Sequence, residues 1–434
     1  MEREKKVYFH TLGCKLNFAE SSTLARQFEE GGFRRTTRSS EADICIINSC
    51  TVTDHADKKC RNIARRIHRE NPSAIIAITG CFAQLSPEEA ASIEGVDIVL
   101  GNNEKVNLYE RVSALAAKQQ STIVDSCSAE EISTFFASCS GGDRTRSFLK
   151  VQDGCDYKCA YCAIHYARGC SRNIPISDII PQAEAAAAKG IKEIVITGVN
   201  TGDFGRTTGE KFIDLLRELD RVEGIERYRI SSIEPNLLTD EIIEFCAAST
   251  KFQPHFHIPL QSGCDKILGL MRRRYTTAIY ADRIAKIRSL MPDAFIGIDV
   301  IVGFPGESEE DFAATYNFLK NLAPAYLHIF PFSERENTPA LTMPNKVREC
   351  DKRDRAGRLG ELCEELHYSF CKQWSGSVGR ILVENSVKDG KMFGYTENYV
   401  KVQIEADRSL AGKIVKVKLG DIDNNCTLSG EVIN

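Results

Sequence analysis

The chain has 434 residues, of which 42% are hydrophobic and 27% are charged, and its formal net charge is −4. This length is enough for two or three domains, and the charge excludes a protein that binds nucleic acid through an overall excess of basic residues. No apolar run approaches the roughly 18 residues of a membrane span, and the charged N-terminus lacks the apolar core of a signal peptide, so we expect a cytoplasmic protein without membrane contact.

Residues 1–118 alternate short apolar runs with helical patterns, which is typical of an open parallel α/β sheet. We expect strands at 7–9, 44–48, 74–79 and 98–100, and helices at 18–30 and 54–69. Cys14, Cys50 and Cys81 follow the first three of these strands. Because the carboxyl ends of parallel strands meet at one sheet edge, these thiolates could hold a 4Fe-4S cluster with one open iron. The alternative is three unrelated loop cysteines.

The expected helix after Cys50 has a basic face. Basic residues recur along it at helical spacing: Lys58, Lys59, Arg61, Arg65, Arg66 and Arg69. Such a face can bind an RNA backbone, and we predict Arg61 and Arg65 as substrate contacts. A solvated helix surface is the alternative interpretation.

Residues 119–146 are rich in Ser, Gly and Thr and are predicted to be a linker. Beyond them, Cys155, Cys159 and Cys162 have the spacing C-x3-C-x2-C. Three thiolates leave a tetrahedral zinc site one ligand short, but they can hold three irons of a 4Fe-4S cluster. The open iron could take a chelating amine and carboxylate, as S-adenosylmethionine (SAM) offers, and the spacing resembles the cluster loop of radical SAM enzymes. The alternative is a zinc knuckle completed by His165 or Cys170.

Residues 147–374 repeat strand and helix. The expected strands lie at 148–152, 193–197, 227–231, 255–260, 294–302 and 326–330. Six βα units predict a partial, TIM-like (β/α)6 barrel with its chemistry at the C-terminal ends of the strands, and the resemblance of the cysteine loop implies a barrel of the radical SAM type. Glu234, Gln261 and Asp299 are expected to face the barrel mouth and to bind SAM or substrate.

Two further SAM contacts follow from the resemblance to radical SAM enzymes. Gly198 and Asn200 lie in a stretch, Thr197 to Asn200, that resembles the loop binding the SAM amino group. The backbone at Tyr161 resembles the usual adenine contact. For each predicted contact, a helix cap or a bond inside the barrel is the alternative.

Three further residues are predicted to bind substrate, the first of them just beyond the cluster loop. Arg168 could pair with the SAM carboxylate or an RNA phosphate, or form an ordinary surface salt bridge. Arg273 and Tyr275 belong to a run that mixes charge with an aromatic ring, as expected where an unpaired nucleotide is held.

Residues 375–434 alternate with period two at 379–383, 399–404 and 414–419, which predicts a small antiparallel β-barrel. This segment resembles the TRAM domain, an RNA-binding barrel at the end of many tRNA-modifying enzymes. It holds eight Lys or Arg and eight Asp or Glu, so its charge alone does not predict RNA binding.

The cysteine motifs at 11–17, 48–52 and 79–84 resemble those of the methylthiotransferase family of radical SAM enzymes, and the resemblance covers essentially the whole chain. It implies that Cys14, Cys50 and Cys81 hold an auxiliary 4Fe-4S cluster. It also implies that one SAM serves as the radical source and another as the methyl donor when a C–H bond is replaced by C–S–CH3.

The form of the motif around Cys14, the runs at 257–264 and 329–333 and the short C-terminal barrel resemble one branch of this family. That branch acts at C2 of N6-threonylcarbamoyladenosine, just 3′ of the tRNA anticodon at position 37. The isopentenyladenosine branch, which usually has Gln-Met in place of Lys15-Leu16, is the alternative, and a branch acting on a ribosomal-protein aspartate comes third.

The resemblance implies a tRNA anticodon stem-loop as substrate and a reductant such as flavodoxin or ferredoxin, and it leaves the sulfur donor open. Two other classes of protein stay open. One is a zinc-containing, non-catalytic RNA-binding protein. The other is a radical SAM dehydrogenase that uses the auxiliary cluster as an electron acceptor.

Overall fold

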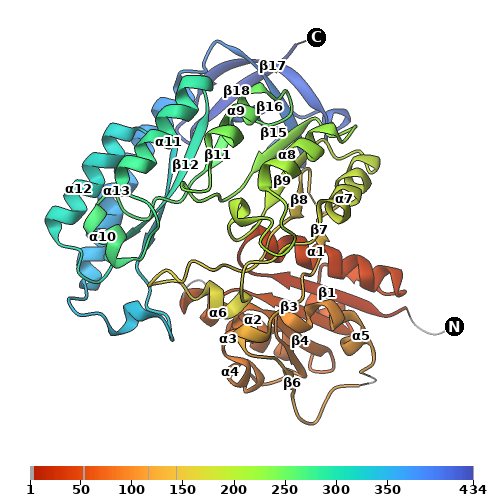
Figure 1. Ribbon diagram of the computed structural model, residues 1–434. Helices are drawn as coiled ribbons and strands as arrows, with labels where there is room; N and C mark the ends of the chain where they lie inside the picture. Colours follow the sequence, from red (N-terminus) through yellow and green to blue (C-terminus); the bar gives the residue numbers. More distant parts are fainter. Residues whose placement is uncertain (1–3, 52–53, 116, 143, 434) are drawn as a thin grey trace.

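The computed structural model describes residues 4–51, 54–115, 117–142 and 144–433. Three units follow one another along the chain (Figure 1): an N-terminal sheet domain, a central half-barrel and a small C-terminal barrel at the opposite end of the molecule. Each was expected from the sequence pattern.

The N-terminal unit is a parallel α/β sheet with strand order β2-β1-β3-β4-β5-β6, and all of these pairs are parallel. This confirms the predicted sheet and adds edge strands at both sides. Its elements are β1 (Lys6–Thr11), α1 (Lys15–Glu30), β2 (Arg34–Thr36), β3 (Ile44–Ser49), α2 (Asp54–Glu70), β4 (Ile75–Gly80), α3 (Cys81–Leu85), α4 (Pro87–Ala91), β5 (Ile98–Leu100), α5 (Leu108–Ser113) and β6 (Ile123–Asp125).

Helices cover both faces of this sheet, which is why its central strands are continuous apolar runs. Every residue of β3 is buried. Ile44 and Ile46 pack with residues of α1 and α5, whereas Cys45 and Ile47 pack with residues of α2, α3 and α4. The sheet is therefore fixed from both sides, and only the ends of its strands are left to form a site.

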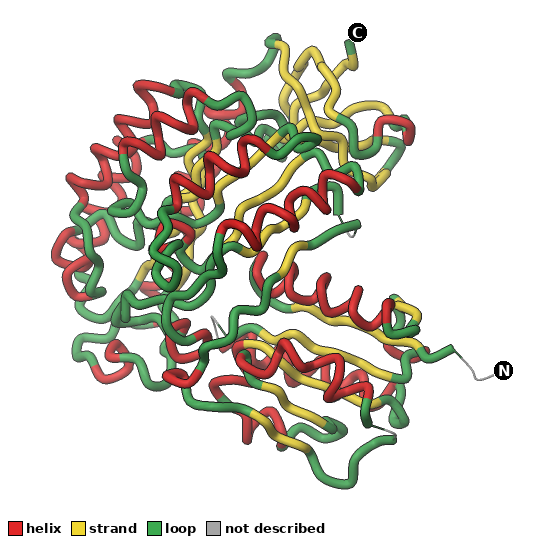
Figure 2. The backbone as a smooth tube through the Cα atoms, turned by 45° about the vertical axis from the view of Figure 1, so that its right-hand side comes forward, coloured by secondary structure: helices red, strands yellow, loops and turns green. Residues whose placement is uncertain are grey.

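The central unit is a partial parallel barrel with helices outside (Figure 2). Strands β10-β9-β8 and β11-β12-β13 form parallel sheets, joined by parallel bridges between Tyr228 and Phe252 and between Ser232 and His257. The predicted half-barrel is confirmed. Its elements are β7 (Ser138–Cys139), β8 (Ser147–Lys150), α6 (Ile164–Arg168), α7 (Ile176–Ala188), β9 (Glu193–Thr197), α8 (Phe212–Arg221), β10 (Arg227–Ile230), α9 (Asp240–Ala248), β11 (His255–His257), α10 (Asp265–Leu270), α11 (Thr277–Leu290), β12 (Phe295–Val302), α12 (Glu309–Leu322), β13 (Tyr326–Pro331) and α13 (Glu349–Lys372).

The stretch at 119–146, which was expected to be a linker, contributes a strand to each neighbouring sheet. Within it, β6 extends the N-terminal sheet in parallel, and β7 pairs antiparallel with β8 of the half-barrel. Both strands cover sheet edges that would otherwise offer unpaired backbone groups. This stretch thus ties the two units together.

The C-terminal unit is a closed barrel of β14 (Val378–Lys388), β15 (Lys391–Tyr395), β16 (Lys401–Glu405), β17 (Ile414–Ile422) and β18 (Thr427–Val432). The expectation of a purely antiparallel barrel needs a correction, because β16 and β18 pair in parallel. Among the described residues the ring has five strands. Directions cannot alternate all the way around an odd ring, so one parallel pair is unavoidable.

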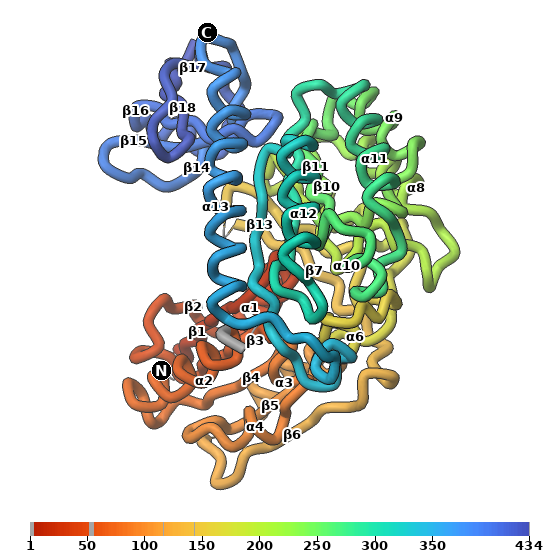
Figure 3. The backbone as a smooth tube through the Cα atoms, turned by 90° about the vertical axis from the view of Figure 1, so that its left-hand side faces the viewer, coloured from red at the N-terminus to blue at the C-terminus, as the bar shows by residue number. Residues whose placement is uncertain are grey.

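Helix α13 connects the two ends of the molecule. It packs along β13 of the half-barrel and reaches β17 of the C-terminal barrel (Figure 3). Cys371, near its end, belongs to the core of that barrel. None of the helices in the described part of the chain combines the length and apolarity needed to cross a membrane.

Candidate active site

Cys14, Cys50 and Cys81 lie together at the carboxyl edge of the N-terminal sheet. The register pairs Thr11 with Asn48 and Asn48 with Thr79, so the three strands end side by side. A Cβ on Gly13 would lie 2.7 Å from Cys50 Sγ, which shows how closely the first loop meets the second. Cys81 lies within electrostatic range of Cys14.

Asn17 fixes two of these loops. Its side-chain amide donates to the carbonyls of Leu12 and Ser49, each at 2.8 Å. The Ser49 hydroxyl donates to the Thr79 carbonyl at 2.5 Å, which links the second strand end to the third. Buried bonds of this kind hold backbone in place because breaking them would leave buried polar groups unpaired. The cysteine edge is therefore rigid.

Cys155, Cys159 and Cys162 occupy one loop between β8 and α6. The Ile164 backbone N–H donates to Cys162 Sγ at 3.4 Å, and Arg273 Nη1 donates to Cys159 Sγ at 3.1 Å. Burial, with help from neighbouring thiols, raises the pKa of Cys155 and Cys162 to about 12. Without a metal these thiols therefore keep their protons at neutral pH, and a metal that bound them would have to displace those protons.

The two cysteine loops are neighbours in space. Helix α3, which begins at Cys81, packs against α6, which follows Cys162. The side-chain amide of Asn102 donates to the Ala167 carbonyl at 2.6 Å across this contact. The helix that begins at one cysteine trio is thus in contact with the helix that follows the other, and the shared substrate site stays a prediction.

A buried ion network joins the same two units. Glu20 of α1 accepts from Lys105 at 2.6 Å and Lys150 at 2.8 Å, and Arg168 donates to Glu20 at 3.1 Å and Asp153 at 2.8 Å. Burial alone would raise the pKa of Glu20, but Arg168, Lys105 and Lys150 outweigh it and hold the pKa well below its ordinary value. The carboxylate is ionised, and the network is a permanent charge cluster.

This network corrects the prediction that Arg168 contacts SAM or RNA. Its side chain is only 2% exposed. Its guanidinium also donates to Asn17 Oδ1 at 2.6 Å, so its donors serve protein acceptors. Arg168 therefore positions the two loops and is closed off from a ligand.

Arg273 and Tyr275 also lie elsewhere than predicted. Arg273 is buried beside the cysteine loop, where it pairs with Glu234 and donates to the Tyr161 hydroxyl at 3.3 Å. The Tyr275 hydroxyl donates to the Pro259 and Leu260 carbonyls, at 2.9 and 2.8 Å. Both predictions of a nucleotide contact are corrected, because these side chains are part of the interior around the cysteine loop.

The residues predicted to bind SAM fall into two groups. Tyr161 and Glu234 both contact Arg273 beside the cysteine loop. Burial raises the pKa of Glu234, although Arg273 opposes the shift. Gly198 and Asn200 follow β9, and the Asn200 backbone N–H donates to Gln152 Oε1 at 2.9 Å. The Asn200 side-chain nitrogen is buried without a partner among the described residues.

Gln261 and Asp299, which were predicted to face the barrel mouth, are joined through their backbones. The Gln261 backbone has φ +69° and its N–H donates to the Asp299 carbonyl at 2.8 Å. The Asp299 carboxylate accepts from His257 Nε2 at 2.7 Å. Asp299 lines a large cavity that Cys14 also lines.

That cavity, which we call the central cavity, has a volume of about 1180 Å³ and is bounded by all three units. Gly13, Cys14, Lys15 and Leu16 form its N-terminal wall, and the lumen of the half-barrel and the C-terminal barrel form the rest. Five of its lining residues are Lys or Arg and two are acidic, so its walls favour an anion: Lys15, Arg144, Arg146, Arg229 and Lys401 against Asp299 and Glu384.

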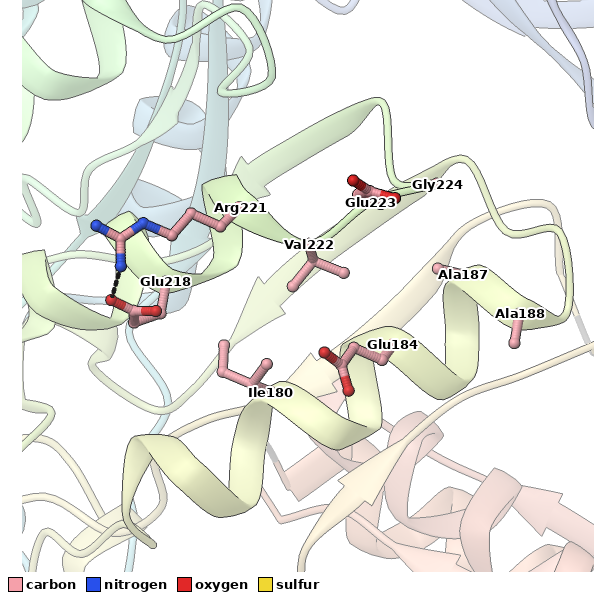
Figure 4. Close-up of a pocket in the computed structure, with 9 residues that line it drawn as sticks. All are labelled: Ile180, Glu184, Ala187, Ala188, Glu218, Arg221, Val222, Glu223 and Gly224. Atoms are coloured by element: carbon pink, nitrogen blue, oxygen red, sulfur yellow. Dashed lines mark hydrogen bonds and ion pairs between the residues drawn. The ribbon is translucent and has the colours of Figure 1, made fainter.

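A second hollow lies on the outer surface of the half-barrel, between α7 and the end of α8 (Figure 4). Its volume is about 630 Å³, and Glu218 and Arg221 pair across its rim at 2.5 Å. None of the predicted site residues lines it. The candidate site is therefore the central cavity and the cysteine loops beside it.

The basic face of α2 is only partly available. Arg61 pairs with Glu89 at 2.6 Å and lies over the Phe82 ring, whereas Arg65 is exposed. Their RNA contacts stay predictions. The sequence reasoning missed Asn17, Glu20 and Lys15 as site residues. Lys15 directly follows a predicted cluster ligand, and that position was the available signal.

Two family models match the chain: "Uncharacterized protein family UPF0004" over residues 6–101 and "Radical SAM superfamily" over residues 149–319. Among solved structures, the radical S-adenosylmethionine methyltransferase TsrM of Kitasatospora setae aligns with a TM-score of 0.59 and 15% identity, over 78% of this chain and 77% of that one. That likeness concerns the fold alone. Together with the matching family model, the fold defines a radical SAM enzyme.

Proteins of similar sequence show which family of radical SAM enzymes the chain belongs to. "Threonylcarbamoyladenosine tRNA methylthiotransferase MtaB" of Bacillus subtilis is 42% identical, over 95% of this chain and 93% of the relative. The Aquifex aeolicus protein of the same name is 37% identical, over 95% and 99%. "tRNA-2-methylthio-N(6)-dimethylallyladenosine synthase" of Acetivibrio thermocellus is 33% identical, over 99% and 92%. The chain belongs to the MtaB-like family of radical SAM methylthiotransferases, which confirms the resemblance.

Membership of this family implies SAM and a 4Fe-4S cluster, and the structure fits both. Three thiols share one loop with an N–H and a guanidinium aimed at their sulfurs, the environment that stabilises cluster thiolates. The unpaired amide nitrogen of Asn200 offers a donor to a polar ligand nearby. Among the described residues the cysteines form no disulfide.

Proposed function

We propose that this enzyme inserts a methylthio group at C2 of N6-threonylcarbamoyladenosine 37 in tRNA. The observation that carries the proposal is the 42% identity to the Bacillus subtilis enzyme over nearly the whole of both chains. The packing of the Cys81 helix against the helix after Cys162 supports it, because sulfur insertion needs both cysteine trios at one substrate.

In this proposal Cys155, Cys159 and Cys162 would hold the cluster that binds SAM, and Cys14, Cys50 and Cys81 a second 4Fe-4S cluster. When bound, these groups and SAM supply the electron, the radical and the sulfur for breaking an unactivated C–H bond, which acid–base chemistry cannot do at neutral pH. The protein positions the reacting partners and excludes water.

Several side chains would perform that positioning. Asn200 and Gly198 would bind SAM beside the cysteine loop, and Glu234 would contribute a carboxylate whose other oxygen is held by Arg273. Gln261 and Asp299 would line the path from SAM to the substrate. The Arg168 network would keep the two loops at a constant separation while substrate enters and leaves.

The expected substrate is a tRNA anticodon stem-loop, and the expected site of action is therefore the cytoplasm. Arg61 and Arg65 of α2 and the C-terminal barrel are proposed to bind its backbone. A reductant such as flavodoxin or ferredoxin is proposed as the electron source. The division into residues 1–118, 119–146, 147–374 and 375–434 stays our working division of the chain.

The test is anaerobic reconstitution with iron and sulfide, followed by reaction with SAM, a reductant and tRNA and by mass spectrometry of the nucleosides. We expect 2-methylthio-N6-threonylcarbamoyladenosine. In the Cys14→Ser variant we expect iron to fall from about eight to about four per chain and the product to vanish, while SAM cleavage persists. Cys350→Ser, which changes an exposed cysteine on α13, is the matched control and should keep iron and product.

The relatives that make a methylthio derivative of dimethylallyladenosine, at 33% identity, define the competing function. Modification of dimethylallyladenosine tRNA in place of threonylcarbamoyladenosine tRNA would assign the chain to that reaction. Bound zinc without iron, and no product with either tRNA, would instead support a non-catalytic protein.

A further inference from the structure

Lys15 is the first residue of α1 and stands next to Cys14 in the wall of the central cavity. Within the described residues, its ammonium forms no hydrogen bond and no ion pair within 4 Å. It lies within electrostatic range of Tyr399, Arg146 and Asp299, which line the same cavity from the other two units. Lys15 thus presents a positive charge to the cavity at the point nearest the N-terminal cysteines.

Other cations of this cavity already have partners. Arg146 donates to Glu384 at 2.9 Å and to the Tyr399 hydroxyl at 3.0 Å. Arg229 donates to Glu193 at 2.9 Å and to the Thr396 and Glu397 carbonyls. These arginines hold the C-terminal barrel in place. Lys15 has no such partner among the described residues and its side chain is exposed to the cavity, and an unpaired cation in a cavity wall favours a bound anion.

Asp299 is the carboxylate within electrostatic range of Lys15, but it already has a hydrogen-bond partner. The Asp299 carboxylate accepts a hydrogen bond from His257 at 2.7 Å. His255 offers a further group that could bind a ligand, because its Nδ1 is buried and has no hydrogen-bond partner among the described residues. Burial and nearby cations lower the pKa of His255 well below its ordinary value, so the ring is neutral and can donate one N–H. A ligand with an anionic group and a hydrogen-bonding group would satisfy both positions.

We propose that Lys15 binds the carboxylate of the threonylcarbamoyl group of the substrate base, with the polar lumen around His255 receiving the rest of that group. This inference rests on the proposed function and names the residue that selects its substrate. The threonylcarbamoyl group carries a carboxylate and a hydroxyl, whereas a dimethylallyl group is apolar. Because Lys15 adjoins Cys14, the contact would also bring the base beside the N-terminal cysteine trio.

The test measures the affinity of the reconstituted enzyme for fluorescently labelled anticodon stem-loop RNAs by anisotropy. Two RNAs carry threonylcarbamoyladenosine, one as the free acid and one as the methyl ester, which removes the charge and keeps the shape. We expect the wild type to bind the acid about tenfold more tightly than the ester, as a charge-assisted hydrogen bond implies. Lys15→Gln should abolish this preference, and Lys15→Arg should keep most of it.

Lys401→Gln is the matched control, since Lys401 lines the same cavity from the C-terminal barrel. It should weaken both RNAs by the same factor. If Lys15→Gln also weakens both RNAs equally, Lys15 binds the RNA backbone or supports the fold, and the proposal is overturned. If the wild type binds the acid and the ester equally well, the proposal is also overturned. This comparison needs no variant, so it remains decisive even if Lys15→Gln loses iron.

The same RNAs separate this inference from the proposed function. A wild type that forms no methylthio product on the free-acid RNA contradicts the proposed function. A wild type that forms the product while Lys15→Gln keeps the tenfold preference contradicts only the assignment of Lys15.

Discussion

At the scale of single residues, Arg168 shows how a charge can be structural in a site full of functional groups. Its position just after the cysteine loop predicted a ligand contact. The fold instead surrounds it with Glu20, Asp153 and Asn17, all of which precede the loop in sequence. Sequence distance hides this arrangement, because Glu20 lies 148 residues away from Arg168. Only the packing of the first helix against the half-barrel brings them together.

Replacing Arg168 by leucine should destabilise the protein by about 3–5 kcal/mol, because Glu20 and Asp153 would be left buried with less compensating charge. Urea unfolding followed by circular dichroism measures the free energy. Arg221→Leu is the control, since this side chain is 73% exposed and pairs only with Glu218 nearby, and it should change stability by less than about 0.5 kcal/mol. Equal effects of the two substitutions would contradict a structural role for the network.

At the scale of elements, the turn between β1 and α1 determines where Cys14 lies. Gly13 has φ +92°, and an added Cβ would lie 2.6 Å from Cys50 Cβ. The turn therefore needs glycine for its conformation and for its close approach to the second cysteine loop. The strand ends at Cys50 and Cys81 then complete the cysteine edge.

Gly13→Ala should displace Cys50 and reduce the iron bound after reconstitution from about eight to about four per chain. Gly32→Ala is an informative control, because Gly32 has a similar φ of +86° but nothing within 4 Å of its Cβ position. It tests backbone strain without the clash. Iron analysis and visible absorption compare the two, and equal iron in both variants would show that the contact between Gly13 and Cys50 is unimportant.

Most elements were predictable because their patterns are local. The predicted strand at 193–197 matches β9 in the structure. The short strand β2 was missed because its sequence, Arg34-Arg35-Thr36, has no apolar residue, and β7 was missed because two residues give no period. The N-terminal cysteine trio was predictable because strand ends meet by topology, and the second trio because its members share one loop. The burial of Tyr275 depends on carbonyls of Pro259 and Leu260 that no pattern reveals.

At the scale of the whole molecule, the C-terminal barrel is attached through two buried arginines of β10. Arg227 donates to the carbonyls of Tyr395 and Arg380, at 3.0 and 2.8 Å, and Arg229 to those of Glu397 and Thr396, at 2.7 and 2.8 Å. Both side chains are 1% exposed. Because the barrel closes one side of the central cavity, this attachment also shapes the candidate site.

Replacing Arg227 and Arg229 together by methionine should loosen the barrel, since four hydrogen bonds to its backbone carbonyls would be lost. Hydrogen exchange should then speed up at residues 395–397, and the affinity for an anticodon stem-loop should fall. Arg380→Met provides the comparison, because Arg380 is 54% exposed and forms surface pairs with Glu226 and Glu397. Unchanged exchange in the double variant would mean that other contacts, such as those of α13 and Arg146, are enough to hold the barrel.

Helix α1 fixes the position of Cys14 relative to the half-barrel. It starts beside Cys14 and Lys15, and five residues later, about 7.5 Å along its axis, Glu20 is bound to Lys105, Lys150 and Arg168. The wall that carries the first cysteine therefore cannot swing away from the half-barrel. A nucleoside lodged between them would keep a single alignment through two successive chemical events, with no repositioning between the first and the second.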